Sequence, residues 1–266
     1  MTILITGSSS GIGKATAKLF HEKGWNVIAT MRNPEKESAV KTLDRMLVTR
    51  LDVTDLESIN ASVKQGLDRF GKIDVLLNNA GFGVFGPLEA TPIEKIREQF
   101  NTNVIGLLET TKAILPSFRA NHDGMIINVS SVAGRVTFPL GSLYHGTKFA
   151  VEGISEALSF ELAEIGVKVK IIEPGEVRTS FKFDVVNDEG IREYQRLIRG
   201  LQEFMKNVSN VGSDPTSVAE VIYRAASDGT NQLRYPSGKD AEDLIAKRKA
   251  EDDSTFLADI QKLSAA

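Results

Sequence analysis

Short apolar runs alternate with amphipathic stretches over the first two thirds of the chain. The runs that predict strands lie at 2–6, 26–30, 46–51, 74–78, 125–130 and 167–173. Several are apolar on both faces, which is typical of strands in a parallel sheet covered by helices. Between them, apolar residues recur three and four positions apart, as in KATAKLFHEKG, where Gly24 suits the end of a helix. This alternation predicts right-handed βαβ units and an α/β Rossmann fold, a doubly wound parallel sheet with helices on both faces.

The last third of the chain has a different pattern. Residues 213–229 predict a helix that begins at Asp214–Pro215, and residues 240–263 predict two charged helices. The segment 190–208 is amphipathic, with Ile191, Tyr194, Leu197, Ile198, Leu201, Phe204 and Met205 on one face. We expect it to pack on the body of the protein, with a substrate lid and a membrane-surface helix as alternatives.

No repeat or linker divides the chain. We therefore expect one domain over 1–266, with a cofactor-binding and catalytic core at about 1–180, a substrate segment at about 180–212 and C-terminal helices at about 213–266.

Composition removes several classes of function. The chain has 266 residues, enough for a large core, and no cysteine, which excludes disulfides and thiolate metal sites. Its three histidines lack helical metal-ligand spacing, so we expect no metal. A net charge of −3 without a basic block argues against a nucleic-acid partner. No apolar run approaches the roughly 20 residues of a membrane span, and the first residues do not form a signal peptide, so we expect a cytoplasmic protein.

A glycine-rich turn, TGSSSGIG at 6–13, follows the first predicted strand and opens the first predicted helix. Glycines at 7, 11 and 13 allow backbone N–H groups to approach a pyrophosphate, and the helix N-terminus then faces its negative charge. Glycine-rich turns are common, so the motif alone is weak evidence. Its position between a strand and a helix is what predicts a dinucleotide site.

A tyrosine and a lysine four positions apart, Tyr144 and Lys148, share one face of a predicted helix. An ammonium group nearby favours the phenolate, so we expect the lysine to lower the tyrosine pKa from its ordinary value of about 10. Ser131 ends the fifth predicted strand, at the edge of the sheet where ligands bind in such folds. Its hydroxyl is placed to bind a substrate oxygen; the plainer alternative is a turn-capping serine, a role that would suit Ser130.

These motifs together resemble the short-chain dehydrogenase/reductase family over about residues 2–180. The matching positions are Thr6, Gly7, Gly11, Ile12 and Gly13, then Asn78, Asn79, Ala80 and Gly81, then Asn103, Ser131, Tyr144, Lys148, Pro174, Gly175 and Thr179. The last third resembles the hydroxysteroid and retinol dehydrogenase branch more loosely, through DPTSVAEVIYRAA and LRYPSG.

The resemblance implies a hydride transfer between NADP(H) and a carbonyl or alcohol. Tyr144 would exchange a proton with the substrate oxygen, Ser131 would polarise it, and Lys148 would lower the tyrosine pKa and bind the nicotinamide ribose. Asn103 would hold a water that links Lys148 to solvent; the alternative is a buried asparagine that satisfies a helix irregularity. The cofactor contacts implied are Gly7, Ser9, Ser10, Gly11, Ile12, Gly13, Arg32, Asp52, Val53, Asn79, Ala80, Gly81, Tyr144, Lys148, Pro174, Gly175, Val177 and Thr179.

The tip of the second predicted strand bears on the choice of cofactor. It carries Thr30, Met31 and Arg32, with no carboxylate before Glu35. An acidic side chain there would favour NAD, whereas an arginine can grip a 2′-phosphate, so we expect NADPH to be preferred over NADH.

Phenylalanines near the predicted site suggest an apolar substrate. The candidates are Phe82, Phe85, Phe138, Leu140, Phe181 and Phe183. We expect pairing into a homodimer or homotetramer through helices at 92–115 and 142–165, with Ile154, Leu158 and Leu162 as the seam, unless these three pack on the sheet. A non-catalytic NADP-binding sensor and an epimerase or dehydratase on the same fold are the competing functions.

Overall fold

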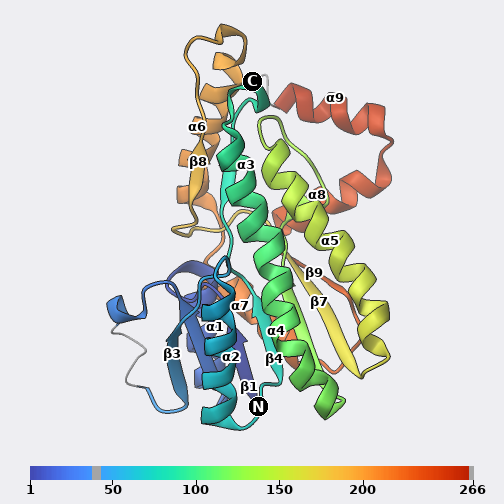
Figure 1. Cartoon of the computed structure of the whole chain (residues 1–266). Helices are drawn as coiled ribbons and strands as arrows, with labels where there is room; N and C mark the ends of the chain where they lie inside the picture. Colours follow the sequence, from blue (N-terminus) through green and yellow to red (C-terminus); the bar gives the residue numbers. More distant parts are fainter. Residues whose placement is uncertain (38–42, 264–266) are drawn as a thin grey trace.

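The core of the molecule is a parallel sheet of seven strands (Figure 1). The computed structural model describes residues 1–37 and 43–263, except for the side chains of 207–211 and 263. The strands are β1 (Thr2–Ile5), β2 (Asn26–Met31), β3 (Met46–Arg50), β4 (Val75–Asn78), β6 (Gly124–Val129), β7 (Val167–Pro174) and β9 (Arg234–Ser237). Their order, β3-β2-β1-β4-β6-β7-β9, confirms the predicted doubly wound fold and places the reversal of strand order between β1 and β4.

Helices cover both faces of this sheet (Figure 1). One face carries α1 (Gly11–Glu22) and α7 (Pro215–Ser227), and the other carries α2 (Leu56–Phe70), α4 (Gly106–Asn121) and α5 (Ser142–Ala163). Side chains of β1 alternate between the two cores: Ile3 and Ile5 face α1 and α7, whereas Leu4 faces α2 and α4. Strands buried on both faces explain why the sequence shows continuous apolar runs rather than alternation.

The predicted helices form with modified boundaries. The 92–115 helix is interrupted: α3 (Ile93–Phe100) leads through a π-helical turn at Asn101–Ile105 into α4. Gly24 has φ +84° directly after the cap of α1, and the Asp214 carboxylate accepts from Thr216 N at the start of α7, as expected of these two ends. The charged C-terminal helices are α8 (Lys239–Ala250) and α9 (Asp253–Leu263).

Three short strands are absent from the sequence prediction. They are β5 (Gly83–Phe85), β8 (Phe183–Val185), which pairs with β5 in a separate two-stranded sheet, and the edge strand β9. Their sequences, GVF, FDV and RYPS, lack the continuous apolar run that marks the predicted strands.

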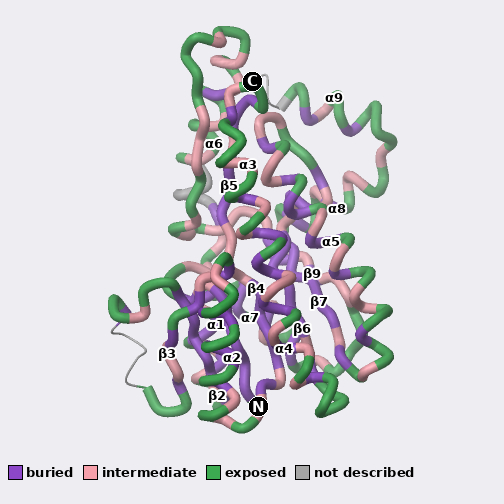
Figure 2. Tube along the Cα trace, in the orientation of Figure 1, coloured by how far each residue is buried: buried purple, intermediate pink, exposed green. Residues whose placement is uncertain are grey.

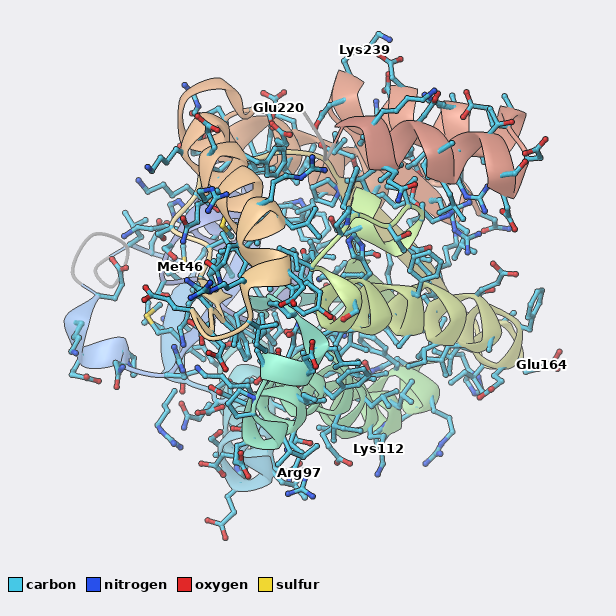
Figure 3. All side chains as sticks on the ribbon, turned by 90° about the horizontal axis from the view of Figure 1, so that it is seen from above. Met46, Arg97, Lys112, Glu164, Glu220 and Lys239 are labelled. Carbon is cyan, nitrogen blue, oxygen red and sulfur yellow. The ribbon has the colours of Figure 1, made fainter. Side chains whose placement is uncertain are left out.

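A second, more exposed part of the molecule projects beyond the carboxyl ends of the strands. It contains β5, β8, α3 and α6 (Gln195–Val211), and Figure 2 shows its mostly exposed surface against the buried strands below. The amphipathic segment 190–208 lies here; Ile198 is buried while Phe204 is 52% exposed, so only part of its apolar face packs on the body. Charged side chains such as Arg97, Lys112 and Glu164 extend from the rim into solvent (Figure 3).

Among the described residues, none of the helices is both long and apolar enough to cross a bilayer.

Candidate active site

The glycine-rich turn lies at the reversal point of the sheet, between β1 and α1. Gly7 adopts φ +71°, and a Cβ at Gly13 would lie only 2.3 Å from the Gly7 carbonyl oxygen. These two positions therefore require glycine for close backbone approach. Ser10 precedes α1 in an extended conformation and makes no side-chain capping bond. The first N–H groups of α1 are thus left for an anion, the arrangement that suits a pyrophosphate.

The end of β4 is joined to this turn by hydrogen bonds. Thr6 Oγ1 accepts from the backbone N–H groups of Asn79 (2.9 Å) and Ala80 (3.0 Å). Asn79 Nδ2 donates to the carbonyl oxygens of Thr6 (2.9 Å) and Gly7 (3.1 Å). The NNAG element therefore fixes the shape of the glycine turn, and Thr6, the first residue of the glycine motif, is the hub of the contact.

A cleft of about 670 Å³ opens beside the turn. Gly11 and Thr179 face each other at its edge, where a Cβ on Gly11 would lie 3.2 Å from Thr179. Lys14, Lys18 and Arg178 line it together with the acidic residues Glu22 and Asp214. The close backbone approach and the uncapped helix start fit a dinucleotide phosphate group.

The remaining predicted cofactor contacts take varied positions. Arg32 follows the end of β2, is exposed and forms no ion pair with any described residue. Asp52 Oδ1 accepts from Thr54 N (3.0 Å), so its carboxylate closes a local turn. Val53 packs tightly on Gly106 of α4. Beyond β7, Gly175 N donates to Ser237 O (3.0 Å), and Val177 pairs with Ser213 in an isolated bridge.

Tyr144, Ser131 and Lys148 meet at the carboxyl edge of β6. Tyr144 and Lys148 lie one turn apart on α5, and Lys148 Nζ is 5.7 Å from the centre of the tyrosine ring. Lys148 Nζ also donates to the carbonyl oxygen of Val129, at the end of β6 (2.9 Å). The Ser131 hydroxyl forms a hydrogen bond with the Tyr144 phenol and accepts from Ala133 N (3.1 Å). Ser131 thus both caps a turn and faces the tyrosine, whereas its neighbour Ser130 is buried against α5.

The electrostatics of this group correct one expectation. Burial raises the pKa of Tyr144 to about 12, and the hydrogen bond from Ser131 opposes this only in part. The pKa therefore does not fall below its ordinary value as expected, because the Lys148 ammonium lies against the ring and bonds to a backbone carbonyl. Burial also lowers the pKa of Lys148 to about 8. Both groups are therefore displaced toward their neutral forms by desolvation.

Asn103 lies in the π-helical turn and is buried. Its Oδ1 accepts from Phe82 N (3.1 Å), and its Nδ2 donates to Phe82 O (2.8 Å) and to Thr147 Oγ1 (3.1 Å). Both amide hydrogens are used, so the side chain acts here as the structural asparagine of the alternative interpretation; the water-holding role stays a prediction.

Aromatic rings surround Tyr144. Phe85 and Phe181 lie 5.3 and 6.0 Å from its ring, and Phe183 contacts both of these rings. The other predicted lining residues differ: Phe82 is buried, and Phe138 and Leu140 line a separate cleft of about 490 Å³ with His145 and Phe149.

The chain is similar to known oxidoreductases. Residues 1–190 match the family model described as short chain dehydrogenase. The chain belongs to the short-chain dehydrogenase family. An uncharacterized oxidoreductase of Schizosaccharomyces pombe is 50% identical to this short-chain dehydrogenase over 232 residues, covering 87% of the chain and 98% of the relative. The 3-ketodihydrosphingosine reductase of Bacteroides thetaiotaomicron is 36% identical (93% and 91% covered), and the retinol dehydrogenase 8 of Bos taurus is 33% identical (96% and 87% covered).

Solved structures give the same family. A short-chain dehydrogenase from Streptomyces avermitilis superposes with a TM-score of 0.85 at 32% identity, over 99% of this short-chain dehydrogenase and 98% of its own chain. A relative from Burkholderia cenocepacia, solved in complex with NADP, has a TM-score of 0.77 at 25% identity (97% and 96% covered). A 3-ketoacyl-(acyl-carrier-protein) reductase from Brucella melitensis, with a TM-score of 0.75 at 25% identity (90% and 98% covered), was solved with NADH.

Proposed function

We propose that this oxidoreductase transfers a hydride between NADP(H) and an apolar carbonyl or alcohol, with Tyr144 as the proton donor and acceptor. The observation that carries the proposal is the meeting of Tyr144, Ser131 and Lys148 at the carboxyl edge of the sheet, beside the glycine turn. Ligands bind at this edge in doubly wound folds, where strand order reverses.

The bound nicotinamide supplies the hydride in reduction and accepts it in oxidation. The phenol of Tyr144 keeps its proton at neutral pH, because burial raises its pKa to about 12. It can therefore donate that proton to a carbonyl oxygen as the carbon gains the hydride, which yields the alcohol; in the reverse direction the tyrosine takes the proton back. Ser131 donates a hydrogen bond to the same oxygen, and the charged form of Lys148 stabilises the tyrosinate left behind.

The cofactor preference is proposed from the end of β2. Arg32 is exposed, has no ionic partner among the described residues and follows a strand tip without a carboxylate. A free guanidinium binds a phosphate through charge-assisted hydrogen bonds. Similar structures were solved with NADP and with NADH, so the relatives do not favour either cofactor. The proposal for NADPH therefore rests on the charge and exposure of Arg32.

An apolar substrate is proposed from the rings of Phe85, Phe181 and Phe183, which form a wall beside Tyr144. Two relatives are named for long apolar substrates, 3-ketodihydrosphingosine and retinol. A lipid-like or aromatic carbonyl fits both observations.

The test is oxidation of NADPH against a panel of aliphatic, steroid-like and aromatic carbonyls, measured for wild type and Tyr144→Phe. Phenylalanine keeps the ring and removes the acid, so kcat should fall at least about 10²-fold while NADPH affinity stays nearly unchanged. Wild-type turnover in Tyr144→Phe would refute the tyrosine mechanism. NADPH binding without turnover on any carbonyl would favour the sensor, and stereochemical inversion or water loss without net cofactor oxidation would favour the epimerase or dehydratase.

We also propose that the functional unit is a homodimer or homotetramer paired through α4 and α5. The expected seam needs correction, because Leu162 is buried and Leu158 packs beside it on the sheet. The outward face of α5 instead exposes Phe149 (45%) and Phe160 (72%), and Ile105 of the adjoining turn is 48% exposed. Such a row of apolar side chains on one face suits a twofold contact with a second copy.

Phe160→Glu should convert the oligomer to monomer in light scattering at micromolar concentration, because it buries a charge in the contact. The matched control is Phe204→Glu, an equally large exposed residue on α6 away from α5. A monomeric wild type, or an unchanged mass in Phe160→Glu, would contradict this interface.

A further inference from the structure

A buried carboxylate follows the tyrosine and lysine on the same helix. Glu152 comes four residues after Lys148 and eight after Tyr144, so the three side chains occupy successive turns along one face of α5. Lys148 and Glu152 are 7% and 5% exposed. The lysine is therefore bordered by the tyrosine ring on one side and by a carboxylate on the other, in a region that water scarcely reaches.

The last strand of the sheet holds Glu152 in place. Arg234, the first residue of β9 and part of the LRYPSG stretch, donates from Nε to Glu152 Oε2 (2.9 Å). The same guanidinium pairs with the exposed Glu156 (2.5 Å) and approaches Glu173 of β7 (3.7 Å). Arg135 pairs with Glu173 at 2.7 Å. Arg135 and Arg234 thus neutralise the buried carboxylates of Glu152 and Glu173 where α5 packs on the sheet.

Packing around Glu152 is close. A Cβ at Gly134 would lie 2.6 Å from Ser130 Oγ, 3.0 Å from Glu152 Cγ and 3.0 Å from the Lys148 carbonyl oxygen. A side chain at position 134 would therefore press on Glu152 and on the turn of α5 that carries Lys148. Among the described residues, Glu152 Oε1 and Glu173 Oε2 are buried and accept no hydrogen bond of regular geometry.

Charges in such surroundings act on one another strongly. Burial lowers the pKa of Lys148, and the Glu152 carboxylate acts in the opposite direction. The pKa of Glu152 is raised overall, because burial and the neighbouring Glu173 outweigh the effects of Ser130 and Arg234, which lower it. These are the groups that face Glu152 from β6, β7 and β9, and Lys148 precedes it on α5. The arginine favours the carboxylate form of Glu152, which in turn favours the ammonium form of the lysine.

We infer that Glu152, held by Arg234 of β9, is a positioning residue that keeps Lys148 charged next to Tyr144. The inference rests on the proposed function for its catalytic consequence, since the ammonium form of Lys148 stabilises the tyrosinate in the reaction. It assigns a role in the active site to Arg234, which lies beyond the part of the chain that the family model matches.

The experiment measures the protonation of Lys148 directly by NMR. Protein labelled with ¹³C at lysine Cε is titrated without substrate, and the Lys148 signal is assigned by its loss in Lys148→Arg. In Glu152→Gln, which keeps the shape and removes the charge, the Lys148 midpoint should fall by about one pH unit from the wild-type value near 8. The matched control is Glu156→Gln, which removes the exposed carboxylate that also pairs with Arg234. It should leave the Lys148 midpoint within about 0.2 pH unit of the wild-type value.

Turnover supplies the second readout. A midpoint lowered by one unit reduces the charged fraction of Lys148 at pH 8 from about one half to about one tenth, so kcat/KM in Glu152→Gln should fall about fivefold at pH 8 and less than twofold at pH 6. A loss of equal size at both pH values would indicate a purely structural role and overturn the inference. Equal Lys148 midpoints in the two glutamine variants would also overturn it.

One measurement needs no variant. In wild type labelled at the glutamate carboxyl carbon, the Glu152 signal should show a step at the Lys148 midpoint, because the two charges are coupled. The absence of that step would overturn the inference even where Glu152→Gln fails to fold. If Lys148 responds as expected but no carbonyl is reduced, the proposed function fails while the charge coupling stands.

Discussion

At the residue scale, desolvation governs the candidate site more than pairwise charge does. The helical spacing of Tyr144 and Lys148 suggested a tyrosine with a lowered pKa, yet burial raises the pKa of the phenol to about 12. The difference arises because the lysine ammonium is directed to the Val129 carbonyl oxygen rather than to the phenol. A protonated phenol at neutral pH suits carbonyl reduction, where the tyrosine must give up a proton.

Arg32 is the residue from which cofactor choice can be tested. One charge-assisted contact contributes about 1.5–3 kcal/mol, so wild type should prefer NADPH over NADH roughly ten- to a hundredfold in kcat/KM. Met31→Asp with Arg32→Ala should reverse this preference, mainly by adding repulsion against the 2′-phosphate. Lys36→Ala, which removes an exposed cation nearby, serves as the control and should keep the wild-type ratio. Equal use of both cofactors by wild type would show that Arg32 does not read the phosphate.

Some site residues were within reach of the sequence and others were not. The glycine turn, Ser131, Tyr144 and Lys148 could be predicted because each follows from local spacing after a strand or on a helix. The contact of Glu152 with Arg234 joins residues 82 positions apart, and only the position of β9 at the sheet edge brings them together. The amide bonds of Asn103 to Phe82 likewise depend on a π-helical turn that no residue pattern marks.

At the element scale, the two-stranded sheet links the segment that follows β7 to the rest of the candidate site. Gly83, Val84 and Phe85 of β5 pair in parallel with Phe183, Asp184 and Val185 of β8, which brings Phe183 against Phe85. Lys95 of α3 pairs with Asp184 (2.5 Å), and this ammonium lowers the pKa of the Asp184 carboxyl. The Lys95–Asp184 ion pair thus holds β8, which carries Phe183 of the aromatic group beside Tyr144.

Asp184→Asn should weaken the contact between β8 and Lys95 of α3. We expect KM for an apolar carbonyl to rise about two- to fivefold with little change in NADPH affinity, because a partly exposed ion pair contributes about 0.2–1 kcal/mol. Asp188→Asn is the matched control: it lies in the same segment, and its carboxylate accepts from Gly190 N. Steady-state kinetics on both variants check the expectation, and a change in kcat with constant KM would show that the strand pair serves the chemical step instead.

The strands with an apolar run were predictable, and those without one were not. Six strands of the main sheet appear as apolar runs because helices bury both of their faces. In contrast, β5 and β8 are held by each other and by the Lys95–Asp184 pair, contacts made between segments about one hundred residues apart. Such pairing is a tertiary property that local propensity does not encode.

At the scale of the whole molecule, the last third is joined to the sheet by buried polar groups as well as by apolar packing. Lys170 of β7 is fully buried and donates to Asp228 Oδ1 (2.6 Å) and to the Tyr235 hydroxyl (2.8 Å). Tyr235 in turn donates to Asp228 Oδ2 (2.6 Å). This network joins the end of α7 and the strand β9 to the centre of β7.

Lys170→Met should destabilise the fold by about 1–3 kcal/mol in urea unfolding at pH 7, because it removes the buried ammonium that bonds to both Asp228 and Tyr235. Lys168→Met, on the same strand but bonded at the surface to Gly229 O, should change stability by less than about 0.5 kcal/mol. Similar losses in the two variants would show that the buried network contributes nothing of its own.

The network also predicts a dependence on pH. Burial opposes ionisation of Asp228, but the bonds from Lys170, Tyr235 and Thr230 outweigh it and hold the pKa of this carboxyl below its ordinary value of 3.8. A lowered pKa in the folded state stabilises the fold above the unfolded pKa of about 3.9, and this stabilisation is lost as pH falls below it. The difference between wild type and Lys170→Met should therefore shrink below about pH 4.

The place of β9 limits how this chain can be recombined with its relatives. A chimaera that joins the first 190 residues of this protein to the tail of another family member exchanges residues 191–212 of the proposed substrate segment. It also exchanges β9 with Arg234, so the buried carboxylates of Glu152 and Glu173 then face a strand from another protein. Designs for new specificity should therefore graft residues 180–212 alone and retain the native edge strand, so that selectivity changes without altering the proton chemistry.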